Sequence, residues 1–209
     1  MRDISERKRA ATALTNEKQN LDAIFESSPV ALFILDEATN IVRVNTAAVA
    51  LTGGREAAAL QHRPGNALHC VHASENSRGC GYGPACPLCP VRNGIEALLA
   101  NGGTLHGAEL PLELIRNGAP EPVWLAIGAE TIQLDGRRHL CVAMEDITSR
   151  KESEAAIVRQ LNELRRWQRV MLDREDRVQS LKREVNELAV RLAEAPRYPS
   201  QLNSQPGHV

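Results

Sequence analysis

The stretch LDAIFESSPVALFILD, residues 21–36, joins a helical pattern to a strand pattern and decides the architecture of the chain. Upstream of the break, apolar residues recur at roughly helical spacing, which predicts an amphipathic helix: Ala10, Leu14, Leu21 and Phe25. The sequence SSP at 27–29 interrupts that spacing, because proline disfavours helical geometry in the residue before it. The apolar run 30–35 that follows predicts a strand.

Outward from this stretch, turn signals divide the chain into further short elements. The turn-like residues 36–40 separate the first strand from a second apolar run, which predicts a hairpin. The remaining elements are a helical segment at 45–60 interrupted at Gly53 and Gly54, a helix at 91–100, and strands at 41–44, 109–115, 123–134 and 140–147. Turns at 116–118 and 135–136 join the last three strands into hairpins.

Two strands, a loop-rich middle and three more strands predict an α+β fold, a five-stranded antiparallel sheet with helices on one face. An N-terminal helix and a long C-terminal coiled-coil helix are expected to flank it. The predicted organisation is a linker helix at 1–26, a folded domain at 27–151 with a cysteine-rich insert at 68–91, a coiled-coil dimerisation helix at 152–195 and a disordered tail at 196–209.

Three stretches of the sequence resemble the PAS sensor family: residues 21–36, the segment IVRVNTAA at 41–48 and the segment MEDITSRK at 144–151. The resemblance covers about residues 21–151. It implies a PAS-like domain that binds a ligand or cofactor inside its half-barrel, or dimerises, and passes a signal through its terminal helices. The cysteine-rich insert departs from the family pattern, where a shorter connection is expected. The Asn-Cys-Arg-Phe motif of the light-sensing branch is absent, so no flavin is inferred.

A short phrase occurs twice, as DISERK at 3–8 and as DITSRK at 146–151, and the two copies bracket the domain. Each copy places an Asp and a Ser or Thr ahead of a charged stretch, a pattern that caps helices. The repeat leaves open whether the chain is a fragment of a longer protein with several PAS domains.

The insert holds four of the five cysteines of the chain, Cys70, Cys80, Cys86 and Cys89, in the spacing C-x9-C-x5-C-x2-C. In a reducing compartment, clustered thiols indicate metal binding or redox chemistry more often than structural disulfides. Two residues between Cys86 and Cys89 let both sulfurs turn toward one point, as a metal or a cluster corner requires. Glycines at 79, 81 and 83 allow close approach and N–H donation to sulfur. These four cysteines are therefore the predicted metal ligands.

An iron–sulfur cluster is the favoured occupant, in the four-iron form, because all four ligands could be cysteine. Zinc is the alternative, although closed zinc sites more often use two tight cysteine pairs. A dithiol redox switch and unmetallated core cysteines are the remaining interpretations. His69 and His72 could replace a thiolate or donate to one. Cys141, in the apolar strand 140–147, is expected to be a packing residue.

The charges around the insert are predominantly positive. Between residues 62 and 92 Glu75 is the single carboxylate, against Arg63, Arg78 and Arg92. Nearby cations lower the pKa of a thiol. The sequence therefore predicts a local field that favours thiolates.

Beyond residue 156, an apolar residue recurs at every seventh position, and leucines join it in the last third; this predicts a parallel two-stranded coiled coil. The expected homodimer contacts are Ile157, Leu164, Met171, Val178, Leu181, Val185, Leu188 and Leu192. Gln160 and Arg174 occupy seam positions, where a change of register would cost least. A single amphipathic helix folding back onto the domain is the alternative.

The net charge and the motifs of the sequence exclude several classes of protein. A formal net charge of −1 gives no general attraction to nucleic acid or acidic membranes. No secretory signal or membrane-spanning run is present, and no phosphate-binding loop or catalytic module. We expect a cytoplasmic, non-enzymatic PAS sensor that detects redox state, oxygen or a related signal and acts on a separate effector protein. A zinc-stapled interaction scaffold and a small-molecule-binding PAS module are the alternatives. The sequence does not identify the partner or the signal.

Overall fold

The computed structural model describes residues 2–54 and 59–198. For residues 2–6 it describes the backbone only. The chain divides into two units, residues 1–151 and 152–209. The first unit begins with helix α1 (Arg2–Ser27). This helix ends just before Pro29, as the SSP sequence predicted.

The first unit is built on one sheet of five antiparallel strands, in the order β2-β1-β5-β4-β3. The strands are β1 (Ala31–Leu35), β2 (Ile41–Val44), β3 (Thr104–Arg116), β4 (Ala119–Leu134) and β5 (Arg137–Asp146). The β3–β4 and β4–β5 turns have positive φ at both central residues, at Asn117-Gly118 and Asp135-Gly136. Asparagine or aspartate followed by glycine is suited to that geometry. The α+β prediction is confirmed.

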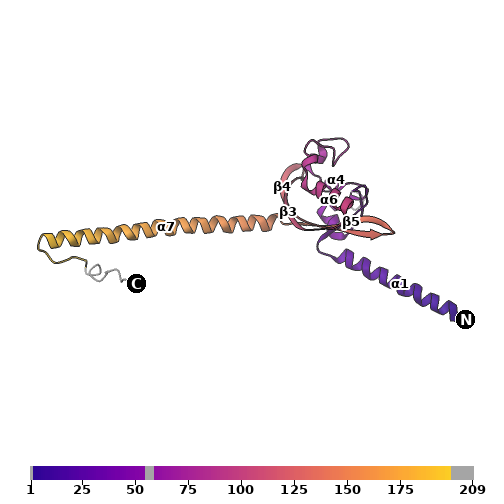
Figure 1. Cartoon of the computed structure of the whole chain (residues 1–209), viewed down its shortest axis with the longest axis horizontal. Helices are drawn as coiled ribbons and strands as arrows, with labels where there is room; N and C mark the ends of the chain where they lie inside the picture. Colours follow the sequence, from indigo (N-terminus) through magenta and orange to yellow (C-terminus); the bar gives the residue numbers. More distant parts are fainter. Residues whose placement is uncertain (1, 55–58, 199–209) are drawn as a thin grey trace. The chain divides into compact units, whose positions relative to one another are not determined.

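The segment between β2 and β3 contains several short helices and one regular helix. They are α2 (Thr46–Leu51), α4 (Pro64–Ala67), α5 (Val71–Ser74), the 3-10 turn η1 (Cys86–Leu88) and α6 (Pro90–Asn101) (Figure 1). The helix expected at 45–60 is shorter, because Gly53 and Gly54 take positive φ directly after α2. Residues 55–58 of that prediction lie outside the described residues.

The core of this unit lies on one face of the sheet. Alternate residues of β1, β4 and β5 are almost completely buried: Phe33, Leu35, Val123, Leu125, Leu140 and Val142. Ala48 of α2 and Ile95 of α6 join the same cluster. The intervening strand residues are less buried, which is the alternation expected of a sheet covered on one side.

One buried polar residue ties α1 to this core. The side chain of Asn45 donates to the carbonyl oxygens of Phe25 and Val30 at 3.2 and 2.9 Å. It accepts from the amides of Leu32 and Ala48, both at 2.9 Å. Asn45 thereby caps α2 and fixes the end of α1 to the first strand.

Helix α7 (Thr148–Arg191) starts at the end of β5 and forms most of the second unit. Nearly all the residues of the predicted dimer seam are exposed, from 41% for Val178 to 72% for Leu192, and Val185 is half-buried. The chain then reverses at Ala193, and the Asn186 side chain bonds both the N–H and the carbonyl of Tyr198 at 2.9 Å. Residues 199–209 of the predicted disordered tail lie outside the described residues.

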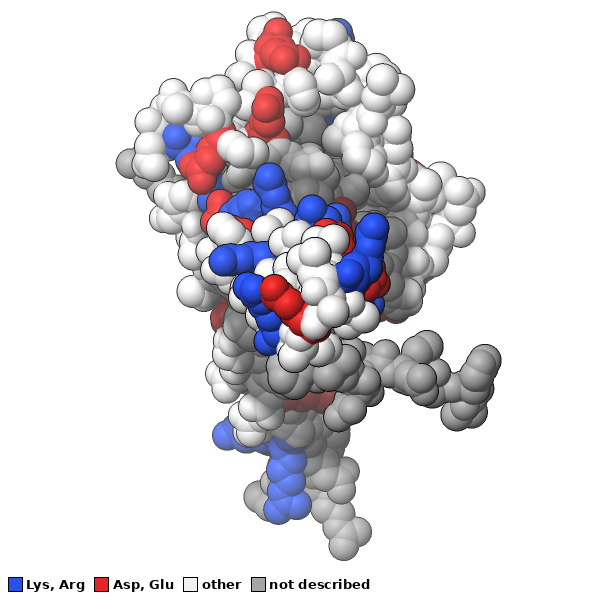
Figure 2. Space-filling model, turned by 90° about the vertical axis from the view of Figure 1, so that its left-hand side faces the viewer, with Lys and Arg blue, Asp and Glu red and all other residues white. Residues whose placement is uncertain are grey.

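Two surface properties bear on partners. Basic and acidic side chains are interspersed on the face of the molecule seen in Figure 2. Within the described ranges, no helix has both the length and the apolar character needed to cross a bilayer.

Candidate sensor site

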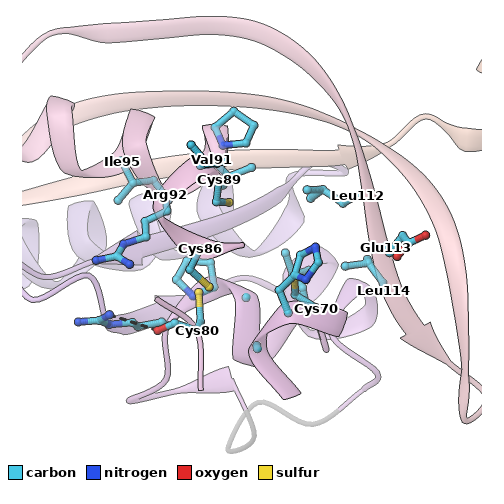
Figure 3. Close-up of a pocket in the computed structure, with 18 of the residues that line it drawn as sticks. Cys70, Cys80, Cys86, Cys89, Val91, Arg92, Ile95, Leu112, Glu113 and Leu114 are labelled. Carbon is cyan, nitrogen blue, oxygen red and sulfur yellow. Dashed lines mark hydrogen bonds between the residues drawn. The ribbon is translucent and has the colours of Figure 1, made fainter. Parts of the chain in front are cut away.

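A cavity of about 450 Å³ lies between the cysteine-rich insert and the sheet. All four predicted ligand cysteines line it (Figure 3). The opposite wall is apolar and comes from α6 and β3, including Ile95, Leu112 and Leu114. The structure therefore brings together thiols from separate parts of the insert around one space.

Cys70 is fixed by the edge strand of the sheet. Its backbone forms an isolated antiparallel bridge with Leu114 of β3. Next to it, the Ile115 amide donates to the His69 carbonyl at 2.8 Å. The insert thus covers part of the open edge of β3, and Cys70 is anchored through main-chain contacts.

Cys80 is held from both sides by groups from α4 and its N-cap. Its amide donates to the Asn66 side-chain oxygen at 2.6 Å, and its carbonyl accepts from an Arg63 Nη1 at 3.2 Å. A Cβ placed on Gly65 would lie 2.6 Å from the Cys80 sulfur. Only glycine at 65 therefore leaves room for this thiol.

The next residue, Gly81, links three parts of the site. Its carbonyl accepts from the Arg92 guanidinium of α6 at 2.5 Å, and its amide donates to the Cys86 sulfur at 3.3 Å. Its φ is +96°, and a Cβ there would lie 2.4 Å from an Arg63 nitrogen. The predicted N–H donation from this glycine-rich loop to sulfur is confirmed at Gly81.

Cys86 and Cys89 bracket η1, and Cys89 is also the N-cap residue of α6. Cys86 is buried, whereas Cys70, Cys80 and Cys89 are partly exposed. The pair separated by two residues therefore lies at a helix junction, with Cys86 as the first residue of η1 and Cys89 between η1 and α6.

The electrostatics of two thiols differ from the sequence prediction. Burial raises the pKa of Cys70 and Cys80, although backbone N–H groups act in the opposite direction. Two of the nearby cations also interact with other groups: Arg92 pairs with Glu96 at 2.6 Å, and Arg78 lies over the Tyr82 ring. The prediction that local positive charge favours thiolates is wrong for Cys70 and Cys80, because desolvation outweighs it.

The histidines and the fifth cysteine fall in different places. His72 lines the cavity, and its Nδ1 is hydrogen-bonded to the Glu75 carboxylate at 3.0 Å. His69 lies in a separate groove beside α2. Cys141 sits in β5 between Ile34 and Glu130 and is outside the cavity lining, as expected for a packing residue.

Among the described residues, no three His, Cys, Asp or Glu side chains gather closely enough to hold a single metal ion. The four thiols are instead distributed around the cavity wall. Sequence reasoning missed Asn66 as the anchor of Cys80 and missed the β3 wall. Neither leaves a local signal, since Asn66 is 14 residues from Cys80 in the chain.

Residues 19–80 match the sequence model described as the PAS domain. The match supports a PAS domain in this chain. It spans α1 to Cys80, so two of the four cavity cysteines lie inside the matched segment.

Solved structures of PAS domains are similar at low sequence identity. The PAS domain of an HTR-like protein from Haloarcula marismortui is 18% identical, with a TM-score of 0.46, over 67% of this chain and 99% of that one. The PAS domain of nitrogen regulation protein NR(II) from Vibrio parahaemolyticus is 18% identical, with a TM-score of 0.42, over 60% and 96%. An RNA-binding light-oxygen-voltage receptor is 20% identical, with a TM-score of 0.48, over 70% and 37%. No curated protein matches the chain.

Proposed function

We propose that this PAS domain is a sensor module whose Cys70, Cys80, Cys86 and Cys89 hold an iron–sulfur cluster, most simply a four-iron cluster. The cluster would detect redox state, oxygen or a related signal. The observation that carries the proposal is that all four thiols line one cavity of about 450 Å³.

The residues of the cavity suit such a group. A four-iron cluster takes four cysteine thiolates, and hydrogen bonds to sulfur tune its potential. Gly81 supplies one such N–H, to Cys86. Arg63 and Arg92 line the same cavity and offer compensating positive charge. Binding iron would also provide the free energy to deprotonate Cys70 and Cys80, whose pKa burial raises.

Two other occupants follow from the same cavity. A closed zinc site brings all its ligands to one ion and needs no internal space, so a cavity of this volume favours a larger group. The apolar wall formed by Ile95, Leu112 and Leu114 suits a small organic ligand, which is the second candidate.

A physical route connects the cavity to the exit helix. Cys70 bridges Leu114 of β3, and two residues further along that strand Arg116 pairs with Asp146 at 2.6 Å. Asp146 caps the start of α7, accepting from the Thr148 amide at 3.0 Å and hydroxyl at 2.6 Å. A change in the insert would therefore act on the first turn of α7 through the β3 edge.

The exposed seam of α7 supports signalling through a parallel homodimer. Ile157, Leu164 and Met171 are 56%, 59% and 70% exposed. A row of large apolar side chains along one helix is stabilised by a partner helix. In this proposal the dimer acts on a separate effector protein, the chain itself catalyses no reaction, and the protein works in the cytoplasm.

The cluster is tested by single Cys→Ser variants of the four cavity cysteines, purified without oxygen, with iron and acid-labile sulfide measured per chain. Each variant is expected to lose most of its iron and sulfide. Cys141→Ser is the matched control, because that thiol lies outside the cavity, and it should keep both. Equal iron in all five variants would contradict the proposed ligand set.

Coupling is tested separately by the distance between spin labels placed at Met171 in the two chains of the dimer. Oxidation or loss of the cluster is expected to change that distance in the parent, and to change nothing in Cys70→Ser. An identical distance in every state would contradict signalling through α7.

A further inference from the structure

Within the cavity, the side chains of Cys80 and Cys86 point toward each other (Figure 3). Two consecutive turns fold the chain back between them. Tyr82 N–H donates to the Gly79 carbonyl at 3.2 Å, and Cys86 N–H donates to the Gly83 carbonyl at 3.1 Å. The five residues between the two cysteines therefore form a tight loop, which brings both thiols to its base.

A hydrogen bond to sulfur also connects the two ends of this loop. The Cys86 sulfur accepts the Gly81 N–H at 3.3 Å, and Gly81 is bonded directly to Cys80. This contact agrees with the view in Figure 3.

The remaining cysteines are positioned differently. Cys89 lies across η1 from Cys86, at the start of α6, and its sulfur is apart from that of Cys86 in Figure 3. Cys70 is held on the far wall by its bridge to Leu114. The sequence singles out Cys86 and Cys89 as the tight pair, whereas the folded chain singles out Cys80 and Cys86.

We propose that Cys80 and Cys86 form a reversible disulfide when a peroxide enters the cluster-free cavity, which gives the sensor site a second, oxidised state. The proposal shares its cysteines with the proposed cluster, and the choice of this pair rests on the geometry alone. With both sulfurs joined, two of the four cluster ligands are withdrawn, and a cluster cannot assemble until the disulfide is reduced.

The chemistry balances with hydrogen peroxide as the oxidant. The Cys86 sulfur, which accepts the Gly81 N–H, gives up its proton and attacks one peroxide oxygen. The O–O bond breaks, giving a sulfenic acid and one water. The Cys80 sulfur then displaces the sulfenic hydroxyl, which leaves as a second water, and the S–S bond forms. Two electrons have passed from the sulfurs to the peroxide, and a dithiol reductant returns them by thiol–disulfide exchange.

The pair is identified by peptide mapping of the full chain after iron chelation, brief peroxide treatment and alkylation of the remaining thiols. Trypsin cuts after Arg78 and Arg92, and chymotrypsin cuts after Tyr82 and Leu88. A Cys80–Cys86 disulfide joins two peptides across Tyr82 and leaves Cys89 alkylated, and this is the expected product. A disulfide across Leu88, a disulfide to Cys70, or no disulfide would overturn the proposal.

Two variants separate this pair from its neighbours. Cys89→Ser should still form the disulfide across Tyr82, and Cys80→Ser should form none; loss of the disulfide in Cys89→Ser would also overturn the proposal. Iron content of the untreated protein is measured in parallel. A chain without iron that forms the disulfide refutes the cluster and supports this inference. A chain with iron and no disulfide does the reverse.

Discussion

At the residue scale, Gly81 is the position on which the cysteine loop depends most directly. It bonds Arg92 through its carbonyl and Cys86 through its amide. It also takes a positive φ where a Cβ would collide with Arg63. The clash and the backbone geometry both require glycine.

Gly81→Ala is therefore expected to destabilise the insert more than an equivalent change elsewhere. Gly53 is the matched control, because its φ of +92° is close to the +96° of Gly81 and a Cβ there meets nothing within 4 Å. Both variants carry the left-handed backbone cost of about 1 to 2 kcal/mol, and Gly81→Ala should lose more. Urea unfolding measures the difference; equal losses would contradict the described packing around Gly81.

The thiols of Cys70 and Cys80 should react slowly at neutral pH. Burial raises the pKa of both above the ordinary value of 9.0, so they remain protonated until more alkaline pH. In the cluster-free protein, their alkylation by iodoacetamide should therefore increase mainly above that value. Site-resolved mass spectrometry measures it, and rapid alkylation of both at pH 7 would contradict the burial described.

Residue spacing singled out the four cysteines that the fold brings to one cavity, and it predicted the N–H donation to sulfur. It could not predict the anchor of Cys80, because Asn66 reaches that amide only after α4 has packed against the loop. The direction of the pKa shift of Cys70 and Cys80 could not be predicted from the sequence either, because it depends on how far folding removes water from each thiol.

At the element scale, the junction of β5 with α7 is the point where a signal would leave the domain. Burial would raise the pKa of Asp146, but hydrogen bonds from Thr148 and Arg116 lower it overall. A lowered pKa in the folded state means that these contacts stabilise the fold above the ordinary carboxyl pKa. That contribution is lost as the pH falls through the lowered value.

Asp146→Asn should lower the free energy of unfolding at pH 7 by about 1 to 2 kcal/mol, the value of hydrogen bonds to a charged group reduced for partial solvent exposure. The deficit should shrink as the pH falls, because the parent loses the same contribution. Glu145→Gln is the control, since it removes a neighbouring charge without touching Thr148. A deficit that is constant from neutral to acid pH would contradict the role of the Asp146 charge.

The hydrogen bonds of Asn45 offer a second test among the elements, because this side chain joins α1, β1 and α2. Asn45→Ser keeps a capping oxygen for α2 but loses the donors to Phe25 and Val30. Asn45→Ala loses the cap as well. We expect a loss of about 2 to 4 kcal/mol for serine, from unsatisfied buried carbonyls, and a larger loss for alanine. Thermal unfolding checks both, and a near-neutral effect of either would contradict the buried network.

The elements themselves were mostly predictable, and the exceptions have local causes. The strand predicted from 109 begins at Thr104, because Gly107, which suggests a loop, instead occupies a bulge between Leu105 and Ala108. The Asn-Gly and Asp-Gly sequences predicted the turns of both long hairpins correctly. The conformational preference of such a turn lies within its two residues, whereas a bulge depends on the pairing with the neighbouring strand.

At the scale of the whole molecule, the proposed signalling requires two chains joined along α7. Val178→Lys puts a charge at the predicted seam, and Val190→Lys puts the same charge on an exposed position of the same helix outside it, where the valine is 61% exposed. We expect the parent and Val190→Lys to sediment as dimers and Val178→Lys to shift toward monomer. A monomeric parent, or equal behaviour of the two variants, would contradict the seam.

The five-stranded antiparallel sheet and the helical exit were predictable from pattern and family resemblance. The closure of the insert over the β3 edge was not, because the Cys70–Leu114 bridge joins segments far apart in the sequence. The dimer stays a prediction, as does the occupant of the cavity.

The most direct measurement is an absorbance spectrum of protein purified without oxygen, with iron, acid-labile sulfide and zinc analysed on the same sample. We expect a broad band at about 400 nm that dithionite or air bleaches, with iron and sulfide in equal amounts, as in a four-iron cluster. One zinc per chain, or a colourless protein without iron, would contradict the proposal that the four cysteines hold an iron–sulfur cluster.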